Sequence, residues 1–140
     1  MTVEEKKALL LRFYDMFRGD STIEPGDICS ESYNDHMPHP GPEGLDALRA
    51  TVRLFRSAFP DAVTEVEVVM CDGHMVAGSQ VFRGTHTGWL MDIAPTGRPV
   101  EFHTMDIVRI DEEEGKIAEI WHLEDNLKLN IQLGVIDPPG

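Results

Sequence analysis

The chain has few cysteines, few basic residues and no long apolar run, and each shortage excludes a class of protein. Its only cysteines, Cys29 and Cys71, lie far apart in the sequence. This argues against a disulfide framework and favours free thiols in a reducing compartment. No apolar run reaches the roughly 18 residues that a membrane span requires, and Met1–Glu5 lacks the basic and apolar regions of a signal peptide. We therefore expect a cytoplasmic protein that does not enter a membrane.

The charge balance excludes a second group of functions. Lysine and arginine number 12 against 25 aspartate and glutamate residues, which gives a formal net charge of -13. Nucleic acids and anionic membrane surfaces require a basic footprint on their partner, so we expect neither as a partner. The sequence also lacks the Gly-x-Ser-x-Gly elbow of serine hydrolases and the lysine of a phosphate-binding loop.

The first half of the chain has the pattern of two amphipathic helices. With 140 residues, the chain should form one domain over residues 1–140. Apolar residues at helical spacing predict helices over 3–18 and 43–59. Thr2 and Glu5 have the spacing of a capping box before the first helix, and Gly19 follows its end. Residues 20–44 are rich in Pro, Gly, Asp and Ser, and only a short helical or irregular piece is expected around Ile28 to Tyr33.

From residue 62 onward the apolar period changes to that of strands. It predicts strands over 63–70, 75–87, 100–110 and 116–125, with turns at 71–74 and 111–115 and a short closing segment at 126–133. Helices followed by four consecutive strands predict an α+β fold. A curved, mainly antiparallel sheet wrapped around the N-terminal helices would bury both apolar faces.

The last predicted strand carries polar groups on a face where core packing favours aliphatic side chains. At a period of two, Glu119, Trp121, Leu123 and Asp125 share one side. A carboxylate beside an apolar aromatic wall is an arrangement that tunes an acid or a base. Asp125 is therefore a candidate general base. The alternative is that Asp125 caps the final short helix or pairs with an arginine.

The register of the last hairpin decides which residues join Asp125. If Ile110 pairs with Lys116 across the turn, Met105 lies opposite Trp121 and His103 opposite Leu123. His103 is then a diagonal neighbour of Asp125 and could orient it or shuttle protons. A slip of one residue would instead place Phe102, Thr104 and Asp106 on that face. We prefer the first register, in which His103, Met105, Glu119, Trp121 and Asp125 share the pocket face.

His36 and His39 are close enough in sequence to suggest a shared metal ion. Zinc requires about four ligands, and Pro38 and Pro40 make this stretch an irregular loop without further ligands nearby in sequence. We therefore expect no metal. Asp35 and His36 are instead expected as a loop pair at the mouth of a pocket, with a solvated loop histidine as the alternative.

Three further residues are candidate contacts of a small molecule. Tyr14 and Phe17 recur at helical spacing, which is typical of a core but also of the wall of a pocket beneath a curved sheet. His86 lies between Gly84 and Gly88, and these glycines permit close approach of the backbone. The expected substrate contacts are Tyr14, Phe17, His36, His86, Met105, Glu119 and Trp121.

Two segments of the chain are distinctive as motifs. They are the Pro95-Thr96-Gly97-Arg98 connection and the Glu119-x-Trp121-x-x-x-Asp125 strand. The other segments that carry the pattern are Leu10–Tyr14, Tyr33–His36, Gly41–Leu45, Gly84–Gly88, Asp106–Ile110 and Gln132–Gly134. In this order the segments resemble the SnoaL-like polyketide cyclases and ester cyclases of the NTF2-like superfamily, over nearly the whole chain.

The resemblance implies a fold and a class of activity. The fold is a cone of strongly curved sheet around a deep apolar pocket, closed by N-terminal helices and paired into a homodimer through sheet faces. The activity is ring closure by intramolecular aldol condensation without a metal or cofactor, with a catalytic carboxylate that matches Asp125. The resulting hypothesis is an enzyme that acts on a small hydrophobic carbonyl or polyketide-like compound. The alternatives are a non-catalytic small-molecule-binding domain, or an isomerase, dehydratase or epoxide hydrolase that uses the same pocket.

Overall fold

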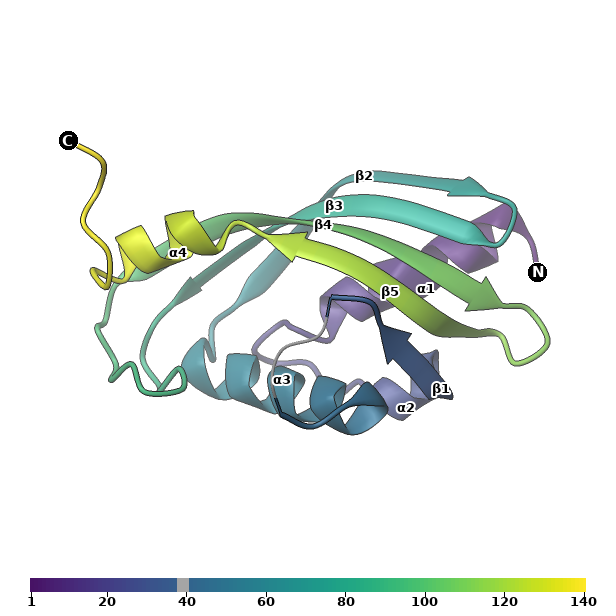
Figure 1. Cartoon of the computed structure of the whole chain (residues 1–140), viewed down its shortest axis with the longest axis horizontal. Helices are drawn as coiled ribbons and strands as arrows, with labels where there is room; N and C mark the ends of the chain where they lie inside the picture. Colours follow the sequence, from purple (N-terminus) through teal and green to yellow (C-terminus); the bar gives the residue numbers. More distant parts are fainter. Residues whose placement is uncertain (38–40) are drawn as a thin grey trace.

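The computed structural model describes residues 1–37 and 41–140, which form a five-stranded sheet and its helices (Figure 1). The order of elements along the chain is α1 (Val3–Asp15), α2 (Pro25–Ile28), β1 (Cys29–Asp35), α3 (Gly44–Ala58), β2 (Val63–Asp72), β3 (Met75–Thr85), β4 (Pro99–Asp111), β5 (Lys116–Glu124) and α4 (Asn126–Gln132). The predicted α+β class is confirmed.

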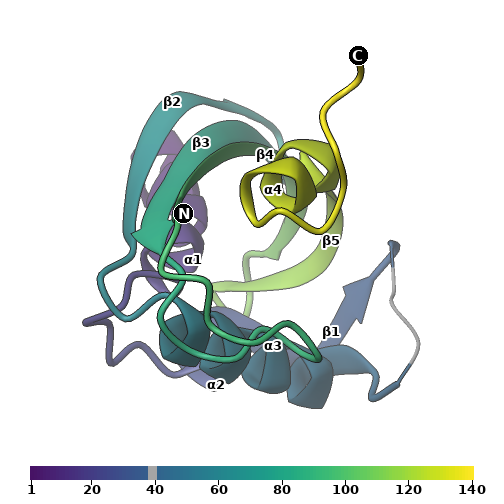
Figure 2. The same cartoon turned by 90° about the vertical axis from the view of Figure 1, so that its left-hand side faces the viewer.

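The sheet is strongly curved and does not close. Its strand order is β1-β5-β4-β3-β2, in which β1 is parallel to β5 and the other pairs are antiparallel. Figure 2 shows β2 to β5 arching over α3, with α1 also beneath the arch. We call the side of the sheet that faces α1 and α3 its inner face and the other side its outer face.

Local signals in the sequence explain the two long helices. Thr2 and Glu5 form the predicted capping box, since the Thr2 hydroxyl accepts from the Glu5 N–H at 3.1 Å and Glu5 Oε1 accepts from the Thr2 N–H at 3.0 Å. In α3, the apolar stripe of Leu45, Leu48 and Val52 is buried. Both helices thus turn the predicted apolar sides toward the sheet.

Strand β1 is an element that the sequence pattern did not predict. Its residues, Cys29 to Asp35, were expected to be irregular or helical because most are polar and lack the alternation of a strand. The strand lies at the edge of the sheet, parallel to β5, and its pairing with β5 is interrupted between Cys29 and Asn34. Its partner and its tertiary position, rather than its own propensity, therefore make it a strand.

The predicted register of the last hairpin is wrong. Lys116 pairs with Asp111 rather than with Ile110, and Met105 lies opposite Leu123. The reason is the turn, because Asp111 remains in the strand while its Oδ1 accepts the N–H groups of Glu113 and Glu114 at 3.0 and 3.1 Å. A bulge between Arg109 and Ile110 then shifts the pairing again.

The inner face of β4 carries Phe102, Thr104 and Asp106, the residues that the alternative register placed on the pocket face. Burial alternates along this strand, and its buried residues are Val100, Phe102, Thr104, Asp106, Val108 and Ile110. Met105 points the other way and is 67% exposed. The face that contains Glu119, Trp121 and Asp125 is therefore the outer face. The polar residues of the interior come from other positions in the sequence.

Candidate active site

A group of polar side chains interrupts the apolar interior between two core clusters. One cluster includes Val76, Val108 and Ile110, and the other includes Phe82 and Phe102. On β3 and β4, the inner-face positions between these clusters are occupied by Gly78, Gln80, Thr104 and Asp106. Together with side chains from α1, β1 and β5, they form what we call the interior cluster: Tyr14, Asp35, Gln80, Thr104, Asp106, His122 and Glu124.

Asp106 is the buried carboxyl group of this cluster. It is 5% exposed. Its Oδ2 accepts the hydroxyl of Tyr14 at 2.9 Å and the hydroxyl of Thr104 at 3.0 Å. Within the described part of the chain no hydrogen bond reaches Oδ1. One oxygen of Asp106 is therefore held in place while the other is available to a bound molecule.

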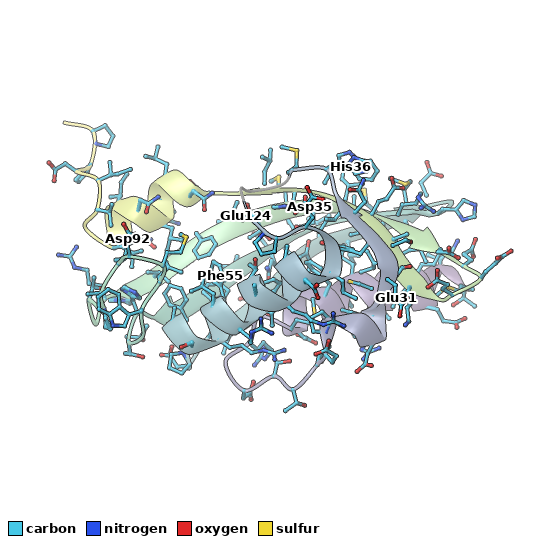
Figure 3. All side chains as sticks on the ribbon, turned by 60° about the horizontal axis from the view of Figure 1, so that its bottom comes forward. Glu31, Asp35, His36, Phe55, Asp92 and Glu124 are labelled. Carbon is cyan, nitrogen blue, oxygen red and sulfur yellow. The ribbon has the colours of Figure 1, made fainter. Side chains whose placement is uncertain are left out.

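His122 joins the two neighbouring strands through a pair of carboxylates. Its Nε2 lies 2.8 Å from Asp35 Oδ2 on β1, and its Nδ1 lies 2.5 Å from Glu124 Oε1 on β5. Figure 3 shows Asp35 and Glu124 next to each other. Their side chains keep 26% and 28% of their surface exposed, against 13% for His122. The cluster is thus open to solvent beside β1 and closed at Asp106.

The surroundings of these groups shift their pKa values in ways that suit proton transfer. Burial raises the pKa of Asp106 to about 6, although the hydrogen bonds from Tyr14 and Thr104 act to lower it. The hydrogen bond to Glu124, together with the charges of Glu124 and Asp35, raises the pKa of His122 to about 9. Near neutral pH, His122 is therefore an imidazolium, and Asp106 exchanges between its carboxylate and carboxylic acid forms.

Asp125 and His103 do not belong to the interior cluster. Asp125 is exposed at the N-terminus of α4, where its Oδ1 accepts the N–H of Lys128 at 3.1 Å. This is the capping role that was the alternative for this residue. His103 lies 2.8 Å from Glu67 on the sheet surface, and its carbonyl accepts the N–H of Asp125 at 3.0 Å. His103 therefore contacts Asp125 through its backbone rather than as the expected diagonal side-chain neighbour, and the catalytic roles predicted for Asp125 and His103 stay predictions.

The remaining residues of the predicted pocket face form a group on the outer face. The rings of His36 and Trp121 stack with centroids 4.2 Å apart. His36 Nε2 lies 2.9 Å from Glu119 Oε1, and Glu119 also pairs with Arg109. The structure therefore brings His36, Glu119 and Trp121 together, while Met105 stays exposed on the same face. Glu119 and Trp121 lie on the opposite face of the sheet from Asp106.

Tyr14, Phe17 and His86 lie inside the molecule. Tyr14 belongs to the interior cluster through its bond to Asp106, and Phe17 packs between the two core clusters. His86 is fully buried, and its Nδ1 accepts the N–H of Thr96 at 3.2 Å. A Cβ on Gly84 would lie 3.1 Å from Phe59, which confirms the predicted close approach near His86.

Within residues 1–37 and 41–140, no group of three or more His, Cys, Asp and Glu side chains is arranged to hold a metal ion. His39, one of the two histidines considered as metal ligands, lies outside the described residues. In the same part of the chain, no helix is long and apolar enough to cross a bilayer.

Comparison with known proteins identifies the relatives of this chain. The sequence profile of the SnoaL-like polyketide cyclase family matches residues 8–133. A candidate polyketide cyclase from Bacillus cereus has a structure with a TM-score of 0.77 and 33% sequence identity, over 94% of this chain and 82% of that protein. No curated protein matches the sequence.

Two Streptomyces proteins share the fold at lower sequence identity. TsrD from Streptomyces laurentii has a TM-score of 0.82 and 23% identity, over 97% of this chain and 99% of that protein. AclR, a candidate hydroxylase from Streptomyces galilaeus, has a TM-score of 0.83 and 23% identity, over 99% of this chain and 87% of that protein. These likenesses confirm the NTF2-like fold.

Proposed function

Because the chain belongs to the SnoaL-like polyketide cyclase family, we propose that it closes a ring in a small hydrophobic carbonyl compound by carboxylate acid/base catalysis. The reaction is an aldol-type cyclisation that requires no cofactor. The observation that carries the proposal is Asp106, a buried carboxyl group with a pKa of about 6 between two apolar clusters. We assign the role of general acid/base to Asp106 rather than to Asp125.

In the proposed reaction, the carboxyl group of Asp106 first removes a proton and later returns it. The carboxylate removes a proton from a carbon flanked by two carbonyl groups, and the electron pair of the broken C–H bond forms an enolate. The enolate carbon then forms a bond to another carbonyl carbon of the same molecule, whose oxygen becomes an alkoxide. The protonated Asp106 returns the proton to this oxygen, so the carboxylate is regenerated. A base works best when its pKa lies near the working pH, and a value of about 6 meets that condition.

The other members of the interior cluster support this chemistry. The hydroxyls of Tyr14 and Thr104 fix the orientation of the carboxylate through Oδ2. His122 is held between Asp35 and Glu124; the charge of Glu124 acts to raise the pKa of Asp106, and the imidazolium of His122 acts to lower it by a smaller amount.

The test is a proton-exchange assay that needs no knowledge of the natural substrate. The probe is ethyl 2-methylacetoacetate in deuterated water, because its single proton between two carbonyls is the kind that Asp106 would remove. We expect the protein to accelerate the exchange, which proton NMR detects. Asp106→Asn should reduce the enzyme-dependent rate by about 10²–10⁴-fold.

Asp125→Asn is the matched control, since asparagine also caps helices well. We expect this variant to exchange the probe at the wild-type rate. Loss of exchange in Asp125→Asn, with exchange preserved in Asp106→Asn, would show that the assignment implied by the family resemblance is the correct one. Tight binding of the probe without any exchange by the wild-type protein would instead favour a non-catalytic binding domain.

A further inference from the structure

Gln80 is an interior polar residue for which the described part of the chain offers no partner. It is 4% exposed, and its Oε1 is completely buried without a hydrogen bond. Buried polar groups in proteins are nearly always paired, because an unpaired one costs about 1–3 kcal/mol. A buried glutamine at this position without a protein partner points to a partner that binds from outside.

The position of Gln80 places its amide beside the proposed catalytic group. On β3, Gln80 lies opposite Thr104, and two residues earlier Gly78 lies opposite Asp106. Gln80 and Asp106 are therefore diagonal neighbours on the inner face, whose Cα atoms are typically about 7–8 Å apart. A glutamine side chain is long enough to reach a molecule that also contacts the Asp106 carboxylate.

The other hydrogen-bond donors of the interior cluster are committed to acceptors within it. The hydroxyls of Tyr14 and Thr104 donate to Asp106, and the two ring nitrogens of His122 face Asp35 and Glu124. Gln80 is therefore the member of the cluster whose amide makes no hydrogen bond to the described residues, and its buried Oε1 is left unsatisfied. An enolate that forms at Asp106 would find its hydrogen-bond donor in this amide.

We propose that Gln80 binds the enolised oxygen of a β-dicarbonyl substrate and stabilises the enolate that Asp106 generates. This proposal rests on the proposed function and names the substrate class of the same site. The amide NH₂ donates to the carbonyl oxygen that gains negative charge when the adjacent C–H bond breaks, and the amide oxygen accepts from a hydroxyl of the substrate or its enol. A donor held where charge develops contributes about 10²–10³-fold to the rate.

The experiment compares Gln80→Met with Ser79→Ala. Methionine keeps the length of the side chain but removes both polar atoms, whereas Ser79 lies opposite Met105 and faces the other side of the sheet. In the ethyl 2-methylacetoacetate assay, we expect Gln80→Met to slow the exchange about 100-fold and Ser79→Ala to leave it unchanged. The midpoint of thermal unfolding should stay equal or rise in Gln80→Met, because the variant no longer buries an unpaired amide.

Binding of 1,3-cyclohexanedione gives a second readout, since this compound readily forms an enolate. We expect Gln80→Met to weaken its binding about ten- to hundred-fold, measured by NMR titration, while Ser79→Ala binds like the wild type. Wild-type exchange and wild-type dione binding in Gln80→Met would overturn the role of Gln80, even if Asp106→Asn is inactive and the proposed function stands.

A wild-type protein that catalyses no exchange would contradict the proposed function. In that case, binding of 1,3-cyclohexanedione alone tests whether the Gln80 amide binds a ligand. Weaker dione binding in Gln80→Met than in the wild type would still support a ligand-binding amide. Equal binding by the two proteins, or no binding by the wild type, would overturn it.

Discussion

The properties of Asp106 come from the small number of residues around it. Burial acts to raise its pKa, and the hydroxyls of Tyr14 and Thr104 act to lower it. Burial is the larger effect, so the pKa settles at about 6 rather than near the ordinary value of 3.8. A carboxyl group at the surface would have been a weaker base, and one without the two hydroxyls would remain protonated to higher pH.

Gly78 is the residue that lets α1 approach the sheet at this point. It lies opposite Asp106, and a Cβ at position 78 would lie 2.8 Å from Leu10 Cδ2 and 3.2 Å from the Tyr14 hydroxyl. A larger residue would push the helix away from β3. The Tyr14–Asp106 hydrogen bond therefore depends on a glycine on another strand, which no local motif indicates.

At the residue scale, the sequence pointed to a carboxylate beside an aromatic side chain, but it did not point to the buried carboxyl group of Asp106. The pattern of β5 showed that carboxylates and an aromatic side chain share one face, yet a period of two does not say which face is buried. Thr104 and Asp106 were named only for the alternative register, and Gln80 and His122 were not singled out. Their roles depend on contacts with α1 and β1, which are distant in sequence.

At the scale of elements, the turn signals predicted where the strands of the two hairpins begin and end. They did not predict the register in which β4 pairs with β5. The hairpin turns at 71–74 and 111–115 lie where the structure places the β2–β3 and β4–β5 connections. The register of β4 and β5 depends on the Asp111 side chain and on a bulge before Ile110. Strand β1 has no signal of its own, and it is fixed in part by the hydrogen bond that His122 on β5 donates to Asp35.

The link between β1 and β5 makes the stability of the fold depend on pH. The pKa of His122 is raised from 6.5 to about 9, chiefly by its bond to Glu124. A group whose pKa is higher in the folded state stabilises the fold fully below its unfolded pKa, here 6.5, and this contribution is lost as the pH rises through about 9. The wild-type protein should therefore be more stable than His122→Gln near pH 6, by about 1–3 kcal/mol.

Urea unfolding of both proteins measures this difference. The advantage of the wild type should shrink as the pH is raised from about 6 to about 9.5, where His122 is neutral in both folded and unfolded chains. An advantage that stays constant over this range would show that the imidazolium does not link the two strands.

At the scale of the whole molecule, the outer face of the sheet carries exposed apolar side chains on β2, β4 and β5. Five large apolar side chains on this face are exposed by 45% to 67%: Val68 and Met70 of β2, Met105 and Ile107 of β4, and Leu123 of β5. Val68 and Met105 both lie opposite Ser79, and Leu123 lies opposite Met105, so these side chains form a continuous row. Exposed apolar rows of this kind mark interaction surfaces.

We propose that two copies of the chain pair through this face, as the family resemblance implied. Leu123→Lys places a charge in the row and should convert the dimer to a monomer, which sedimentation velocity detects. Leu127→Lys is the matched control, because Leu127 is 59% exposed but lies on α4. A wild-type protein that sediments as a monomer would contradict the proposal, as would a Leu123→Lys variant that remains dimeric.

The fold class was predictable because the apolar pattern indicates which faces of the helices and strands must be buried against one another. Two amphipathic helices and four strands can bury their apolar faces in few arrangements, and the motifs of the chain narrowed these to one family. The site was less predictable, because it is formed where α1, β1, β3, β4 and β5 meet.

The pKa of the Asp106 carboxyl group tests the central claim most directly. A carbon-13 NMR titration of the aspartate carboxyl carbons, with the Asp106 signal assigned by its loss in Asp106→Asn, measures it in the wild-type protein. We expect a pKa of about 6, and a still higher value in Tyr14→Phe, because that variant loses a hydrogen bond that favours the carboxylate. A wild-type value near the ordinary 3.8 of an aspartate would contradict the assignment of Asp106 as the acid/base of this protein.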